Sequence, residues 1–201
     1  MKIKRRDRFA AVGMGIFLAI LCPCRAWAFD PWSNLNGYWI SADGRSTIEG
    51  AVKKGVTITK YQNKSGEIRW TQLAEDDISF VMVRLGYSDD MDPYFKANME
   101  GAAKANLDIG VCFYSKAASA EEARKEAAYV LDVVKELKVS YPISFELDAQ
   151  VVQEKKLARD QVTKLTGEFC DAIEEAGYKV VVFGDSEWLT QHVEMRKLPY
   201  D

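Results

Sequence analysis

Apolar segments typical of strands alternate with amphipathic segments typical of helices along most of this chain, and this alternation limits its fold more than any other feature. The strand patterns occupy residues 56–59, 78–86, 107–115, 142–148 and 178–184. Helix patterns lie between them at residues 93–106, 119–137 and 161–176. Strands separated by helices pair in parallel through right-handed crossovers. The sequence therefore predicts an α/β protein.

Two architectures fit this alternation, an open doubly wound sheet and a (β/α) barrel. Neither a G-x-G-x-x-G motif nor a phosphate-binding loop follows a predicted strand, so the nucleotide-binding signature of many open sheets is absent. A closed barrel needs about eight strands, whereas five are visible before the sequence ends at Asp201. The alternation alone leaves both architectures open.

Local signals define several helix ends. Pro93 suits the first turn of a helix. Ser119 and Glu122 form a capping pattern in which each side chain is expected to accept a hydrogen bond from the other residue's backbone N–H. Gly177 can adopt the left-handed conformation that ends a helix. The nearly continuous apolar run at residues 78–86 predicts a strand that is covered on both faces.

The first 28 residues have the features of a secretory signal peptide. Five basic residues precede an apolar run at residues 9–21, and Ala26 and Ala28 provide the small side chains of a cleavage site. The run is short for a membrane span, although an uncleaved anchor is the alternative. We expect a protein secreted to the periplasm or the cell exterior, with a mature chain that begins near Phe29 and has no stable membrane partner.

The remainder of the chain is expected to hold one domain. Residues 29–50 are rich in Asn, Gly and Ser and lack periodicity, so they predict an irregular lead-in. Trp32, Tyr38 and Trp39 are expected to pack this lead-in on the domain formed by residues 51–201. A mature chain of about 173 residues is long enough for one hydrophobic core.

The charge and composition of the chain limit the kinds of partner that the protein is expected to bind. Without residues 1–28 the chain has 21 basic and 29 acidic residues, which argues against a nucleic-acid partner. Cys112 and Cys170 are expected to be buried free thiols, and a disulfide between them is the alternative. His192 is the only histidine, so we expect no metal site and no cofactor. We also expect a monomer, although no sequence feature fixes the oligomeric state.

Two carboxylates lie at the end of the predicted strand 142–148. Glu146 and Asp148 are two residues apart, so both side chains are expected on one face of the strand. Ligands of parallel α/β folds bind at the carboxyl ends of the strands. Two carboxylates held close together titrate differently, which suits the acid and the anion that glycoside hydrolysis needs. Capping of a following helix is the alternative role for such acidic residues.

Seven sequence blocks in a fixed order closely resemble the lysozymes of glycoside hydrolase family 25. The resemblance covers about residues 51–201, and its blocks are residues 55–62, 80–87, 92–98, 109–115, 141–148, 174–178 and 188–189. It implies an irregular, TIM-like (β/α) barrel that lacks its last strands in this sequence. It also implies cleavage of the bond between N-acetylmuramic acid and N-acetylglucosamine in peptidoglycan glycan strands, without a cofactor.

The resemblance assigns roles to the carboxylates and reveals departures from the family pattern. The family's acid is a Glu that closes an Asp-x-Glu motif, so Asp148 takes the position of the general acid and Glu146 that of its partner. Thr57 stands where the family has a further Asp, and another acidic group would come from a strand beyond Asp201. Misplacing a reacting group by about 1 Å can cost on the order of a hundredfold in rate. The exchanged pair still offers one long and one short carboxylate arm.

Aromatic residues at strand ends are candidates for sugar binding, because flat rings with polar tips suit pyranose faces. The candidates for substrate binding, with Thr57, are Tyr61, Tyr87, Tyr114 and Trp188. Packing beneath a loop is the alternative for each of them. Arg84 lies inside an apolar strand pattern, and we expect it to form a structural ion pair rather than a substrate contact.

Three functions remain open from the sequence. The first is a secreted muramidase with Asp148 as general acid and Glu146 as partner carboxylate. The second is a non-catalytic relic that binds peptidoglycan or another glycan, which Thr57 and the inverted motif favour. The third is a fragment of such an enzyme.

Overall fold

The computed structural model describes residues 32–35, 37–41, 44–48 and 50–200. The predicted signal peptide lies outside the described residues. No helix in these described ranges is long and apolar enough to cross a membrane.

Five parallel strands form the main sheet and confirm the α/β class. They are β4 (Lys54–Ile58), β5 (Ile78–Tyr87), β7 (Asp108–Ser115), β8 (Ile143–Leu147) and β9 (Val180–Val182), and they pair in the order of the sequence. A short strand, β6 (Asp90–Met91), pairs antiparallel with the end of β5. A doubly wound sheet reverses its strand order at a switch point, and this sheet has no such reversal. The winding is that of a barrel, and the sheet is open between β4 and β9 in the described part of the chain.

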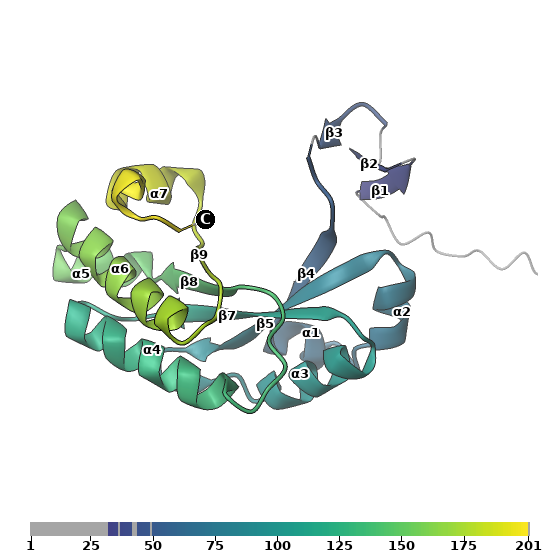
Figure 1. Ribbon diagram of the computed structural model, residues 1–201, viewed down its shortest axis with the longest axis horizontal. Coiled ribbons are helices and arrows are strands. Elements are labelled where there is room, and N and C mark those ends of the chain that lie inside the picture. Colours follow the sequence, from purple (N-terminus) through teal and green to yellow (C-terminus); the bar gives the residue numbers. More distant parts are fainter. Residues whose placement is uncertain (1–31, 36, 42–43, 49, 201) are drawn as a thin grey trace, which may run out of the picture.

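Helices follow the strands and cover one face of the sheet. The three long helices are α3 (Phe95–Lys104), α4 (Ala120–Val134) and α6 (Arg159–Glu175). Figure 1 shows α3 and α4 along the lower side of the sheet, and α4 packs against α6. The shorter elements are α1 (Lys60–Lys64), α2 (Trp70–Glu75), α5 (Ala149–Lys155), α7 (Ser186–His192) and a 3-10 turn at Met195–Lys197. The three long helices match those predicted from the sequence to within a few residues.

Alternation along the strands divides the sheet into a buried face and an open face. Val81 and Val83 of β5 are fully buried beneath the helices, whereas Met82 and Arg84 between them face a cavity. The prediction that this strand is covered on both faces is therefore wrong. Rings from two strands and one helix fill the centre of the core, with Phe169 of α6 4.6 Å from Phe145 and 5.5 Å from Phe113 between ring centroids.

The predicted irregular lead-in instead contains a small antiparallel sheet. Its strands are β1 (Trp32–Leu35), β2 (Tyr38–Ser41) and β3 (Thr47–Ile48). Gly37 and Gly44 adopt positive φ angles of 87° and 68° in the connections, which permits tight turns between strands too short to show periodicity. Trp39 is buried, as expected, with the Lys54 ammonium 5.3 Å from its ring centroid, but Tyr38 is 64% exposed and does not pack on the domain.

The capping predictions are met in part. The Ser119 hydroxyl accepts a hydrogen bond from the Glu122 N–H at 3.2 Å, as expected. The Glu122 carboxylate, however, accepts from the backbone N–H of Ala118 rather than that of Ser119. Gly177 has a φ of 88° after α6, and Cys112 and Cys170 are both free thiols.

Two glycines, one in β7 and one in α6, provide a matched test of how closely these elements pack against their neighbours. A Cβ at Gly110 in β7 would lie 2.6 Å from the Pro142 carbonyl oxygen and 2.4 Å from the Met82 sulfur, so Gly110→Ala should destabilise the fold by about 1–3 kcal/mol. A Cβ at Gly167 inside α6 meets only Leu198, at 3.6 Å, so Gly167→Ala should stabilise it by about 0.5–1 kcal/mol. Urea unfolding measures both, and a stable Gly110→Ala variant would contradict the close packing of β7.

Candidate functional site

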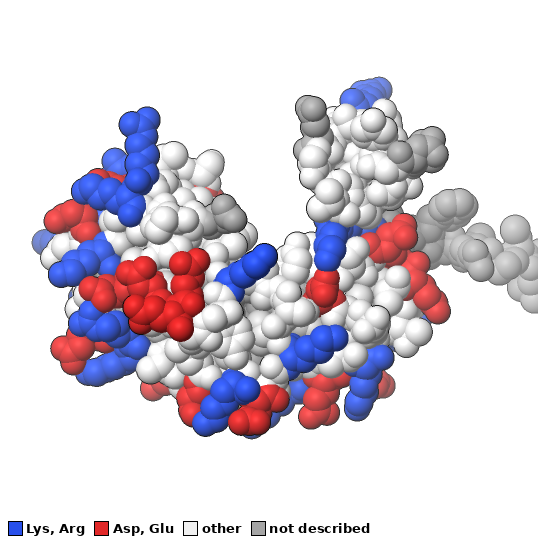
Figure 2. Space-filling view, viewed as in Figure 1, with Lys and Arg blue, Asp and Glu red and all other residues white. Residues whose placement is uncertain are grey.

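The open face of the sheet holds a cavity of about 750 Å³. Alternate residues of the parallel strands point into it because side chains alternate between the two faces of a strand. The lining residues are Thr57, Thr59, Met82, Arg84, Cys112, Phe113, Tyr114, Ser144, Glu146, Val181 and Phe183. Figure 2 shows a broad hollow between α7 and the β1–β3 sheet with a largely uncharged surface. The cavity lies where ligands of parallel α/β proteins bind.

Glu146 is the carboxylate that faces this cavity. It is half-buried near the carboxyl end of β8, beside Tyr114 of β7 in the strand register. Burial raises the pKa of Glu146, the nearby Arg84 guanidinium opposes this rise, and the charge of Asp148 adds to it. Its carboxylate accepts no hydrogen bond from a described residue, and a group in this state can hold a proton for transfer.

Asp148 is held in a different way. It is 6% exposed and is the N-cap of α5, where one carboxylate oxygen accepts a hydrogen bond from the Gln150 N–H at 2.8 Å. The Tyr87 hydroxyl donates a hydrogen bond to the other oxygen. Asp148 does not line the cavity, so the two acids differ in surroundings although they are neighbours in the sequence. The helix-capping role left open by the sequence is therefore present.

Aromatic and basic side chains surround the two acids. The rings of Tyr87 and Tyr114 lie 5.0 Å apart between centroids. Burial and the hydrogen bond to Asp148 raise the pKa of Tyr87, so its hydroxyl stays protonated and can donate. The Lys116 ammonium lies 3.9 Å from the Tyr87 ring centroid, and the Arg84 guanidinium lies 5.7 Å from that of Tyr114. The Lys116 contact restricts the orientation of the Tyr87 ring, whose hydroxyl holds Asp148.

The other predicted substrate residues are dispersed. Thr57 lines the cavity, as Tyr114 does. Tyr61 is 59% exposed on α1, with the ammonium groups of Lys60 and Lys64 within 6 Å of its ring centroid, and it lies outside the cavity lining. Trp188 packs partly buried on α7, and its indole N–H has no partner among the described residues. The structure thus gathers only part of the predicted set.

Arg84 was assigned a structural ion pair in the sequence, and this expectation is wrong. No carboxylate in the described ranges lies within ion-pair distance of it, and its guanidinium instead faces the cavity. The open face of the sheet explains the difference, because a side chain at the wall of a wide cavity keeps access to water and needs no buried partner. The position of Arg84 along its strand could have indicated that it faces the cavity. Arg84 pairs with Cys112, and Cys112 pairs with Ser144, on the face of the sheet that carries Glu146.

No cluster of three or more potential metal ligands occurs in the described part of the chain. His192 lies at the end of α7, with its ring 6.1 Å from that of Trp188 between centroids. What the site offers is therefore a pair of carboxylates, a guanidinium and tyrosine rings. A parallel sheet wound as in a (β/α) barrel, with such a pair at its carboxyl end, is compatible with the class of barrel-type glycoside hydrolases.

Comparison with known families identifies the group within that class. The model of glycosyl hydrolases family 25 matches residues 56–201, and this chain belongs to that family. The comparison with curated proteins gives no match.

Solved structures have the same fold at low sequence identity. The autolysin LytC from Streptococcus pneumoniae, in complex with a synthetic peptidoglycan ligand, has a TM-score of 0.68 at 22% identity over 80% of this chain and 39% of that one. A family 25 glycosyl hydrolase from Bacillus anthracis has a TM-score of 0.61 at 22% identity over 72% and 66% of the two chains. The catalytic domain of endolysin ply40, from bacteriophage P40 of Listeria monocytogenes, has a TM-score of 0.61 at 20% identity over 73% and 69%. The chain thus spans 39% of the autolysin and 66% of the Bacillus enzyme.

Proposed function

We propose that this protein is a secreted muramidase that hydrolyses the bond between N-acetylmuramic acid and N-acetylglucosamine in peptidoglycan. Membership of family 25 supports a glycosidase, and solved relatives include an autolysin bound to a peptidoglycan ligand. The observation that carries the proposal is the contrast between the two acids, since Glu146 faces the cavity with a raised pKa and Asp148 is held beside it by two hydrogen bonds. Secretion rests on residues 1–28 and stays a proposal.

Within this function, we assign the acid to Glu146 and the stabilising anion to Asp148. The sequence predicted the opposite roles. Asp148 accepts hydrogen bonds through both oxygens, which suits a fixed acceptor better than a proton donor. Glu146 has the longer arm, access to the cavity and a raised pKa. If the roles are exchanged along with the residues, the acid again has the longer side chain and the anion the shorter one. The exchanged pair thus still offers one long and one short carboxylate arm, as expected from the sequence.

A glycan-binding protein without turnover is the second candidate, and Thr57 favours it. Thr57 lines the cavity where the family carries a carboxylate. A hydroxyl there can bind a sugar hydroxyl but carries no charge to help the acid or stabilise a transition state. Binding without cleavage requires only the cavity and its Tyr114 ring.

One experiment separates the two candidates. The secreted full chain is incubated with insoluble peptidoglycan at pH 4–8, and new reducing ends and protein retained on the pellet are both measured. New reducing ends from wild type, absent with Glu146→Gln, support the muramidase. Retention on the pellet with no reducing ends at any pH supports the binder.

The pH dependence offers a test of the role of Arg84. Because the guanidinium of Arg84 lowers the pKa of Glu146, Arg84→Met should raise that pKa further. An acid catalyst must be protonated, so the alkaline limb of kcat/KM should move to higher pH in the variant. Lys164→Gln removes a positive charge on an exposed site of α6 and serves as the control. A limb that stays in place or moves to lower pH would contradict the assignment of Glu146.

A further inference from the structure

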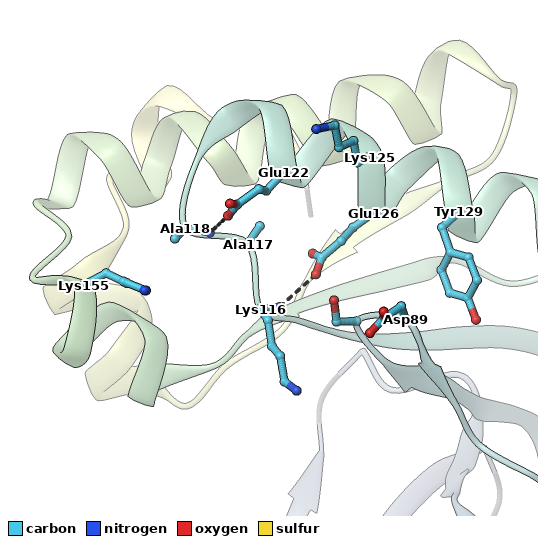
Figure 3. Close-up of a pocket in the computed structure, with 10 residues that line it drawn as sticks. Asp89, Lys116, Ala117, Ala118, Glu122, Lys125, Glu126, Tyr129 and Lys155 are labelled. Carbon is cyan, nitrogen blue, oxygen red and sulfur yellow. Dashed lines mark hydrogen bonds between the residues drawn. The ribbon is translucent and has the colours of Figure 1, made fainter.

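A second cavity of about 580 Å³ lies beside the site and shares none of its lining with the first. Its walls come from the turn after β5, the loop after β7, the first turns of α4 and the end of α5 (Figure 3). Both the turn and the loop follow strands that contribute to the candidate site. The cavity is thus a separate space at the same end of the sheet.

The two glutamates in its wall are already engaged. Glu126 accepts hydrogen bonds from the backbone N–H of Lys116 at 3.0 Å and from the Ser115 hydroxyl. Glu122 accepts one from the backbone N–H of Ala118 at 2.7 Å, and Figure 3 shows both backbone contacts as dashed lines. These hydrogen bonds fix the loop and hold the carboxylates against it, and neither glutamate forms an ion pair with a lysine among the described residues.

Two lysines of this wall remain available to a ligand. Lys155 is exposed at the end of α5, and its ammonium forms no ion pair with a described residue. Lys116 likewise has no carboxylate partner in the described ranges, and its ammonium lies over the Tyr87 ring. Figure 3 shows Lys155 and Asp89 on opposite sides of the cavity, with Asp89 near Tyr129. The cavity therefore offers the ammonium groups of Lys116 and Lys155, with the Asp89 carboxylate across from Lys155.

Short connections join this cavity to the acids. Lys116 contacts Tyr87, and Tyr87 donates its hydrogen bond to Asp148. Ser88, the next residue, lines the cavity in a left-handed conformation with a φ of 55° and donates from its N–H to the Tyr114 carbonyl at 2.8 Å. A non-glycine residue in this region is strained and persists where its surroundings require it. A group attached to a sugar near Asp148 could therefore reach the lysines.

We propose that this second cavity binds the peptide stem carried by the muramic acid of peptidoglycan. The stem is a short peptide with free carboxylates and a side-chain amine, and in intact peptidoglycan it carries the charges, because the lactyl carboxyl group of muramic acid is bound in the amide to the stem. Lys155 and Lys116 bind the stem carboxylates, and Asp89 binds its amine, because charged hydrogen bonds of this kind favour a partner of matching charge. This inference rests on the proposed function and adds that the enzyme distinguishes stem-bearing from bare glycan.

The test compares two forms of one substrate. Insoluble peptidoglycan is used intact or after an amidase has removed its stems and the lactyl carboxylates that the amidase frees have been capped as amides. Pellet retention and new reducing ends are measured separately for the full chain. Lys155→Gln and Asp89→Asn are compared with wild type, and Lys164→Gln controls for the loss of one positive charge. We expect wild type to be retained better on intact material, and each cavity variant to lose about five- to tenfold of its affinity there, without change on bare glycan.

The outcomes separate this inference from the proposed function. Equal retention of wild type on intact and bare material, or an equal loss with Lys164→Gln, would overturn the stem site. Stem-dependent retention without reducing ends from either substrate would support the stem site and overturn the muramidase. Cleavage of both substrates at equal rates with equal retention would leave the muramidase standing and reject the stem site.

Discussion

Replacing Glu146 with glutamine should reduce the release of reducing ends from peptidoglycan by at least about a hundredfold. Glutamine keeps the size of the side chain at the cavity wall but has no proton to give to the leaving oxygen. The same variant should fold normally, because Glu146 accepts no hydrogen bond from a described residue that glutamine would lose. A loss of turnover at unchanged stability is the signature of a catalytic acid.

The difference in stability between wild type and Glu146→Gln should depend on pH in a defined direction. The pKa of Glu146 is raised by burial above its ordinary value of 4.5, so the folded state favours the protonated form. The stability that Glu146 contributes is therefore complete below pH 4.5 and is lost as the pH rises through the raised pKa. Glutamine does not ionise, so the variant should have a Tm equal to that of wild type at pH 4 and equal or higher at pH 7. A lower Tm for the variant at pH 7 would contradict burial as the cause of the shift.

The sheet could be predicted from the sequence because each strand has its own apolar run, and this pattern recurs along the chain. The position of each strand follows from its apolar run, and the parallel pairing of the strands follows from the helices between them. The coverage of the open face could not be predicted in the same way. Whether a face is covered depends on residues distant in sequence, and for this reason Arg84 was given an ion pair that the open cavity makes unnecessary.

The two candidate acids lie at the end of β8, as the sequence predicted, and one short helix gives them different surroundings. Helix α5 begins directly after Asp148 and turns that carboxylate towards its own backbone N–H groups. The signal was present, since an Asp followed by good helix formers from Ala149 onwards is typical of an N-cap. The contact with Tyr87 had no such signal, because 61 residues separate the two partners.

The roles that we propose for the two acids rest on what surrounds each of them. The family pattern places the acid at the position of Asp148, yet here that position holds a buried helix cap. The longer side chain of Glu146 brings a carboxylate into the cavity from the neighbouring position. We propose that the exchange of residue types is compensated by an exchange of roles, because the two environments differ.

Replacing Asp148 with alanine should destabilise the protein by about 2–4 kcal/mol, since it removes the N-cap of α5 and leaves the Tyr87 hydroxyl without its acceptor. Asp148→Asn is the matched variant, because the asparagine oxygen can keep the N-cap hydrogen bond and its NH2 group can donate to the Tyr87 hydroxyl oxygen, so it should lose much less stability in urea unfolding. Both should slow reducing-end release, since neither carries the negative charge.

In Asp148→Asn the pKa of Glu146 should fall, because the charge of Asp148 raises it, and the alkaline limb of kcat/KM should move to lower pH. If Asp148→Asn abolished turnover and Glu146→Gln retained it, Asp148 would be the acid, as the family pattern predicts.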